Sequence, residues 1–126
     1  MFKNNNGTIK NLEIIIASDG MTGTGAIANN NSGTISDCTA KGNITGMDNY
    51  QLSGICGKAG SSNIEKSVVL GNIIGEYYTG GICGYSGLNS EGNITISNCY
   101  FIGEISSTTE YKAGISGYAY GYKYES

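Results

Sequence analysis

The chain has 126 residues, with 7 positive charges against 10 carboxylates and a formal net charge of −3 at pH 7. Nucleic acids and anionic membranes need clustered basic side chains, so this composition argues against both as partners. No apolar stretch approaches the roughly 20 residues that span a bilayer. Histidine is absent, as are the HExxH, P-loop and GxSxG strings, so we expect a noncatalytic protein without a cofactor.

Two strings alternate along the chain and divide it into repeats. The first string is Gly-Ile-Cys-Gly, present at 54–57 and 81–84, as Gly-Ile-Ser-Gly at 114–117 and as Ala-Ile-Ala-Asn at 26–29. The second string is an alternating segment at 35–44, 64–73 and 96–105, with a fainter copy at 9–18. We treat the chain as a single domain whose repeats are 1–23 (partial), 24–49, 50–76, 77–109 and 110–126 (partial).

The period of these strings predicts the fold. Successive isoleucines of the first string, Ile27, Ile55, Ile82 and Ile115, are separated by 28, 27 and 33 residues. A repeat of this size is typical of a solenoid, in which each copy packs on its neighbours. We therefore predict an all-β fold, a parallel β-solenoid with about 4 coils of about 29 residues and incomplete end coils. The crossover rule favours a right-handed β-helix.

Each coil is expected to hold at least two short strands, one at each string, and a third near Ile35 and Ile64. Strict alternation in the second string places Cys38, Ala40 and their equivalents inside and the intervening residues outside. In the middle coils the outward positions become apolar. This predicted outer stripe, a candidate interface, comprises Val68, Leu70, Ile74, Tyr100 and Ile102.

Four cysteines share two columns of the repeat. Cys56 and Cys83 fall at one position, with Ala28 and Ser116, and Cys38 and Cys99 fall at another. Small residues in these columns favour buried free thiols over disulfides, although the strand spacing brings Cys56 and Cys83 within bridging range. Zinc is disfavoured because there is no CxxC pair or histidine. The residues expected to stack in the interior are Cys38, Cys56, Cys83, Cys99, Ile55, Ile82 and Ile115.

Tyrosine is the best lead to a ligand. Tyr118, Tyr120, Tyr122 and Tyr124 alternate with other residues near the end of the sequence, so in a strand all four rings would lie on one face. They are interpreted either as a cap over the end of the stack or as a recognition surface. The repeat also places Tyr85 and Tyr118 in one column and Tyr78 and Tyr111 in another.

The phase of the repeat at its two ends suggests a joint. The segment 4–9 aligns with 30–35, so the sequence starts within a repeat, near its second half, whereas it stops in the first half of another. We expect complementary half-coils that meet head to tail and cover each other's exposed strand edges. A contact of this kind that does not close produces a filament.

The Gly-Ile-Cys-Gly strings resemble the GLUG repeat, a short motif found in tandem on bacterial surface and secreted proteins. Isoleucine occupies the leucine position, and the copy at 26–29 departs from the pattern at Ala26 and Asn29. The resemblance covers almost the whole chain. It implies a stalk or passenger segment of an adhesin, or an accessory region of a surface enzyme, and it carries no catalytic motif.

Two functions of different class follow from these observations. The first is a structural module, located outside the cell or on a bacterial surface, whose partner is itself or neighbouring repeats of a longer chain. The second is an adhesive module that recognises a host glycan or protein through the tyrosine face or the apolar stripe. We rank the structural function first.

Overall fold

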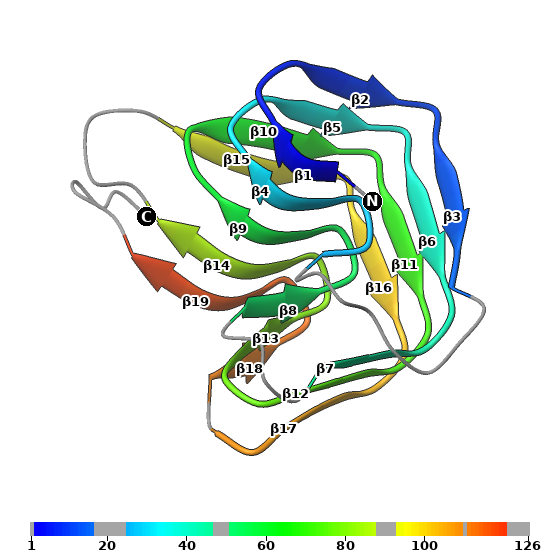
Figure 1. Cartoon of the computed structure of the whole chain (residues 1–126), viewed down its shortest axis with the longest axis vertical. Coiled ribbons are helices and arrows are strands. Elements are labelled where there is room, and N and C mark those ends of the chain that lie inside the picture. The colour runs from blue at the N-terminus through cyan, green and yellow to red at the C-terminus, as the bar shows by residue number, and fades with distance from the viewer. Residues whose placement is uncertain (1, 17–24, 47–50, 88–92, 110, 121–126) are drawn as a thin grey trace.

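The computed structural model describes residues 2–16, 25–46, 51–87, 93–109 and 111–120. Within these residues all regular structure is β-strand. None of them belongs to a helix that is long and apolar enough to cross a membrane. The strands wind in stacked layers around a shared interior, as Figure 1 shows.

Three complete turns, each of five short strands, form the body of the fold. The first complete turn consists of β4 (Ala28–Asn31), β5 (Thr34–Ser36), β6 (Thr39–Lys41), β7 (Ile44–Gly46) and β8 (Gln51–Ser53). The second consists of β9 (Cys56–Ala59), β10 (Ser62–Glu65), β11 (Val68–Leu70), β12 (Ile73–Gly75) and β13 (Tyr78–Gly80). The last consists of β14 (Cys83–Gly87), β15 (Ile94–Ser97), β16 (Tyr100–Ile102), β17 (Ile105–Ser107) and β18 (Lys112–Ala113).

Further described strands flank this body. Before it come β1 (Phe2–Asn5), β2 (Thr8–Lys10) and β3 (Glu13–Ile15), and after it comes β19 (Ser116–Tyr120). The predicted parallel β-solenoid is therefore confirmed, and the described residues form three complete turns where about four coils were predicted. The right-handed sense stays a prediction.

Equivalent strands of successive turns form five parallel sheets, which we label A to E (Figure 1). Sheet A has the order β1-β4-β9-β14-β19, sheet B β2-β5-β10-β15, sheet C β3-β6-β11-β16, sheet E β7-β12-β17 and sheet D β8-β13-β18. The chain passes through them in the order A, B, C, E, D. Sequence periodicity suggested two or three strands per coil, because the shortest strands carry too little alternation to be recognised.

The register agrees with the columns of the repeat. In sheet A, Cys83 pairs with Cys56 and with Ser116, and Cys56 pairs with Ala28. In sheet B, Ile64 pairs with Ile35 and with Ile96. Because each residue lies beside its own repeat equivalent, the same side chain type recurs at the same place in the interior.

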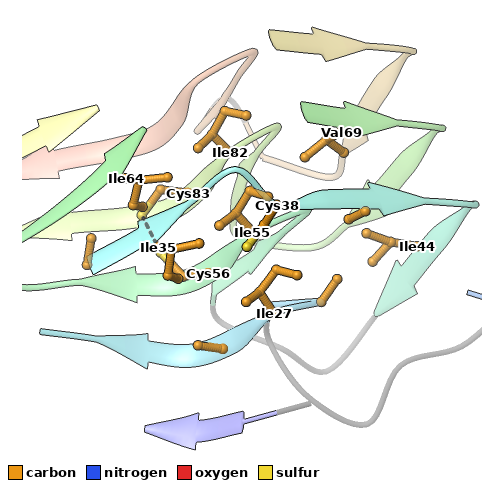
Figure 2. Packing of buried hydrophobic residues seen from close by; sticks show 14 of the residues in the cluster. Ile27, Ile35, Cys38, Ile44, Ile55, Cys56, Ile64, Val69, Ile82 and Cys83 are labelled. Carbon is orange, nitrogen blue, oxygen red and sulfur yellow. Dashed lines mark hydrogen bonds between the residues drawn. The ribbon is translucent and has the colours of Figure 1, made fainter. Parts of the chain in front are cut away.

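The interior is a stack of isoleucines with small residues between them (Figure 2). Ile27, Ile55 and Ile82 follow one another in adjacent turns, and each has no exposed surface. Burying such a side chain stabilises the fold by roughly 1.5–3 kcal/mol. The remaining large buried aliphatic side chains are Ile35, Ile44, Leu52, Ile64, Val69 and Ile73.

The prediction that Ile115 is buried is wrong. Ile115 follows Ile82 in the isoleucine column, and its carbonyl oxygen accepts the Ile82 amide at 3.2 Å. Its exposed fraction is nonetheless 44%, against 0% for Ile82. Among the described strands, sheet A continues on one side of β19 only, so no described layer follows Ile115 in its column.

The corner between sheets B and C repeats in backbone conformation as well as in place. Asn11, Asp37, Lys66 and Asn98 occupy it in successive turns, with φ between 50° and 58°. Asn and Asp tolerate this left-handed conformation, whereas a lysine does so at a cost of roughly 1 kcal/mol. The corner is thus set by backbone geometry, and Lys66 is its least suited member.

Asparagine side chains hold the first layers together. Asn5 Nδ2 donates to Asn31 Oδ1 at 2.8 Å and to the Thr34 carbonyl oxygen at 3.1 Å. Asn31 has no exposed surface and Asn5 is 6% exposed. Such a ladder satisfies buried amides along the stack direction, and it links β1 to β4.

Candidate functional site

Among the residues that the structure describes, no three His, Cys, Asp or Glu side chains come together as a metal site. The remaining candidate sites are surfaces of the solenoid and columns of stacked side chains. They are the cysteine columns, a group of tyrosines at the corner between sheets D and A, the outer face of sheet C, and the two end layers.

The cysteine columns lie in the interior. Cys56 and Cys83 have no exposed surface, and the Cys56 thiol donates to Cys83 Sγ across 3.7 Å (Figure 2). Cys83 Sγ donates in turn to the Tyr85 carbonyl oxygen at 3.0 Å. Cys38 is also buried, whereas Cys99, in the last complete turn, is only half-buried. All of them are free thiols.

The pKa values of three of these thiols are raised, which favours their protonated form. The hydrogen bond to Cys83 and then desolvation hold the pKa of Cys56 well above the ordinary 9.0. Desolvation likewise raises the pKa of Cys38 and of Cys99. Because the thiolate is the nucleophile and the metal ligand, these residues are suited to packing rather than to chemistry.

Four tyrosines, Tyr78, Tyr85, Tyr111 and Tyr118, pack into what we call the tyrosine cluster. Tyr118 stacks on Tyr78 with 4.8 Å between ring centroids and on Tyr85 with 5.5 Å. Tyr111 meets Tyr78 and Tyr118 edge to face, at 5.2 and 5.5 Å. The Lys58 ammonium lies 5.7 Å from the Tyr85 ring centroid.

The sequence predicted the two columns of this cluster, but not that the rings of one column contact the rings of the other. Tyr85 pairs with Tyr118 in sheet A, and Tyr78 and Tyr111 lie side by side at sheet D. The columns merge because β13 and β14 are consecutive strands on either side of one corner. The sequence feature that could have revealed this contact is a seven-residue spacing, which separates Tyr78 from Tyr85 and Tyr111 from Tyr118.

The tyrosine cluster fastens the last layer to the body. Each aromatic pair is worth about 0.5–1.5 kcal/mol beyond its buried area, and Tyr118 of β19 takes part in three pairs. The ring centroids of Tyr78 and Tyr85 are 5.6 Å apart, so these two rings meet Tyr118 from one side. The predicted run continues to Tyr120, the last residue of β19, while Tyr122 and Tyr124 lie outside the described residues.

The outer face of sheet C carries the predicted apolar stripe. Tyr100 and Ile102 of β16 are 65% and 64% exposed, and Val68 and Leu70 of β11, their register partners, are half-buried. Ile74, 44% exposed, lies apart from them on β12 of sheet E. The stripe therefore covers two adjacent strands of sheet C and not one continuous surface with Ile74.

The same face shows that sequence reasoning missed one apolar residue. Ile15 of β3 is 68% exposed and shares a row of sheet C with Lys41, Leu70 and Ile102. Lys41 interrupts the row and forms an ion pair with Glu13 at 3.4 Å. Ile15 and Ile102 thus occupy equivalent outward positions in the first and last layers of sheet C.

The end layers expose residues that belong to the interior. Isoleucines and other apolar side chains in them are only partly buried although they pack against the core. At one end these are Ile9, Leu12, Ile14 and Ile16, and at the other they are Ile94, Ile96, Cys99, Phe101 and Ile105. Those that lie in strands belong to the outermost described strands of sheets B, C and E, and Leu12, Ile16 and Cys99 lie next to these strands.

Comparisons with protein-family models, with curated proteins and with solved structures find no match to this chain. The fold defines it as a parallel β-solenoid. The resemblance to GLUG repeats stays a prediction.

Proposed function

We propose that the chain is a noncatalytic structural β-solenoid module that stacks end to end, as part of an extracellular surface protein or a self-assembling fibre. The observation that carries this proposal is the isoleucine column, in which Ile55 and Ile82 have no exposed surface and Ile115 has 44%. A residue at this position is covered only when another layer follows. The extracellular location is supported by the resemblance to repeats of bacterial surface proteins.

The exposed ends support stacking in a second way. An edge strand with free backbone groups is a template for pairing with another chain. Here the outermost described strands of sheets B and C, β2 and β3 at one end and β15 and β16 at the other, carry apolar side chains that pack against the core. A further turn, from a second copy or from neighbouring repeats of a longer chain, would satisfy both the backbone and the side chains.

Light scattering and negative-stain microscopy test the proposal. The purified chain is expected to gain mass as its concentration rises and to form rods, because stacking buries the end layers. A monomer of constant mass, with no rods at the highest soluble concentration, would rule out stacking by this chain alone.

The exposed stripe favours a second candidate, an adhesive module for a host glycan or protein. Tyr100 and Ile102 are both about two thirds exposed on a regular β surface, and contiguous apolar area of this kind marks interaction sites. Retention on a glycan or host-protein array that is lost on Tyr100→Ser, and kept on Ile74→Thr, would establish it. No retention by the wild-type chain would remove it.

A further inference from the structure

The described interior holds two thiols in direct contact. Cys56 of β9 and Cys83 of β14 are register partners in sheet A, and their sulfur atoms lie 3.7 Å apart (Figure 2). Neither side chain has any exposed surface. Described strands flank the pair on both sides, with Ala28 of β4 next to Cys56 and Ser116 of β19 next to Cys83. The pair is therefore enclosed by parts of the fold that the structure describes.

We propose that Cys56 and Cys83 form an oxidation site, at which a two-electron oxidant joins the two sulfur atoms in a disulfide that links the second complete turn to the last. One S–S bond replaces two S–H bonds, and the oxidant accepts the two electrons and two protons. The bridge lies within one copy of the chain, so it forms or fails independently of the proposed stacking.

Two classes of small oxidant balance this reaction. Hydrogen peroxide converts one cysteine to a sulfenic acid with release of water, and the second thiol then displaces another water as the S–S bond forms. A small disulfide such as oxidised glutathione first forms a mixed disulfide with one cysteine and releases one thiol, and attack by the second cysteine releases the other.

The geometry of the pair fits a bridge. Adjacent strands are about 4.8 Å apart, which lies within the range of about 4.4–6.8 Å that disulfides span between Cα atoms. The sulfur atoms must approach from 3.7 Å to about 2.05 Å. A rotation of about 30° at each of the two side chains, the edge of an ordinary rotamer well, is of the size needed.

Oxidation leaves no buried donor without a partner. At present the Cys56 thiol donates to Cys83 Sγ, and the Cys83 thiol donates to the Tyr85 carbonyl oxygen at 3.0 Å. Both S–H groups disappear in the reaction, and the product is uncharged. A disulfide therefore suits this interior, whereas a thiolate does not.

The second cysteine column provides a control within the same chain. Cys38, Ser67 and Cys99 directly precede the register partners Thr39, Val68 and Tyr100, so Ser67 occupies the layer between the two cysteines. Its hydroxyl oxygen accepts the Cys38 amide at 3.2 Å. Two layers amount to about 9.6 Å, beyond the roughly 7 Å over which Cα atoms can be bridged. Cys38 and Cys99 should therefore stay reduced.

Burial determines when the bridge can form. The thiolate is the reactive species, and the pKa of Cys56 is held well above 9.0 by the hydrogen bond to Cys83 and then by desolvation. Both sulfur atoms are also shielded from solvent. We expect the bridge to form as the last turn packs on the second, while the thiols are still accessible to the oxidant.

Refolding the full chain from urea in a glutathione redox buffer tests the site. The thiols that remain are alkylated after unfolding, and cleavage after lysine and glutamate separates all four cysteines. The expected result is a loss of mass of two hydrogen atoms, with Cys56 linked to Cys83 and with Cys38 and Cys99 alkylated. Alkylation of all four, or a predominant bridge to Cys38 or Cys99, would overturn the proposal.

Matched serine variants test the assignment. Cys83→Ser should abolish the linked peptides, and the fold should accept it because Ser116 occupies the same column. Cys99→Ser is the control and should retain the Cys56–Cys83 link in full. A bridge that persists in Cys83→Ser, or one that is lost in Cys99→Ser, would contradict the pairing. Circular dichroism confirms that each variant is folded.

Urea denaturation tests whether the bridge holds the turns together. It joins residues 27 positions apart, and closing such a loop restricts the unfolded chain. Wild-type chain refolded with oxidised glutathione should therefore unfold at a higher urea concentration than chain refolded with dithiothreitol. Cys83→Ser should unfold at the same concentration after both treatments. Equal midpoints for the bridged and the reduced wild type would overturn the link between the turns.

Discussion

The inner turns and the last layer contain the same repeat but not the same environment. Ile55 and Ile82 of the inner turns have no exposed surface, whereas Ile115 at the equivalent position is 44% exposed. Cys38 is 1% exposed, and Cys99 in the same column is half-buried. The difference teaches that burial in this fold is set by the adjacent turn and not by the residue type.

This dependence is the behaviour of a quasi-one-dimensional protein. Each repeat contacts only its neighbours, so stability is close to a sum of intrinsic and nearest-neighbour terms. The same substitution should therefore cost much in an inner turn and little at an end. Paired substitutions at equivalent positions test this directly.

The largest difference is expected at the isoleucine column. Ile82→Ala should lower the free energy of unfolding by about 4 kcal/mol, since it leaves a cavity between the layers of Ile55 and Ile115. Ile115→Ala should cost about 1 kcal/mol, because its side chain is already partly solvated. Urea denaturation of both variants measures the difference, and equal losses would contradict the comparison.

The glycine that precedes each of these isoleucines provides the next test. A Cβ on Gly81 would collide with the Gly114 carbonyl oxygen and the Phe101 ring, whereas one on Gly114 meets nothing within 4 Å. We expect Gly81→Ala to destabilise the fold by about 3 kcal/mol. Gly114→Ala should be neutral or stabilising by up to about 1 kcal/mol. Thermal melts of the two variants should differ accordingly, and a stable Gly81→Ala variant would be inconsistent with the packing.

The tyrosine cluster shows that the last layer has its own stabilisation. Tyr118→Ala is expected to cost about 2 kcal/mol, because three ring pairs are lost together. Tyr100→Ala, at a position 65% exposed, should cost no more than about 0.5 kcal/mol. Chemical denaturation compares the two. If the variants were equally stable, the ring pairs would not be fastening β19.

A smaller effect is expected at the corner between sheets B and C. Lys66 has a φ of 50°, and Lys66→Asn should stabilise the protein by roughly 0.5–1 kcal/mol because asparagine tolerates this region. Asn98→Lys, at the equivalent corner of the last turn with φ 52°, should cost a similar amount. The stability changes in the inner turn and in the end turn should be of similar size, since backbone strain does not depend on a covering layer. Melting temperatures of both variants decide the point.

The smallest effect at neutral pH is that of the thiols. The folded pKa values of Cys56, Cys38 and Cys99 are raised above 9.0, so the folded state favours the protonated thiols. Their contribution is fully present below pH 9 and is lost as the pH rises through the raised folded values. Stability measured by urea titration should be flat from pH 6 to 8 and fall above 9. Replacing Cys56 by alanine, the residue found at the same position in Ala28, should weaken that fall.

Much of the fold could be predicted from the sequence, because residues at equivalent positions of the repeat lie side by side in adjacent turns. Equivalent residues such as Ile35 and Ile64, or Tyr85 and Tyr118, had to lie side by side once a solenoid was assumed. The number of strands per turn could not be predicted, since segments of three residues carry too little alternation. The union of Tyr78 with Tyr118 depends on a corner angle, which a column alignment does not contain.

The same reasoning explains the errors at the ends. Column membership predicted a buried Ile115, but burial needs a following layer, which the sequence pattern does not reveal. Ile15 was missed because its outward row is interrupted by Lys41 in the next turn.

Hydrogen exchange measured as a function of protein concentration tests the central claim most directly. If copies stack through their end layers, amides of β2, β3, β15 and β16 should gain protection as the concentration rises, while amides of β10 and β11 stay unchanged. Protection that is independent of concentration in all of these strands, or a gain confined to β10 and β11, would contradict end-to-end stacking.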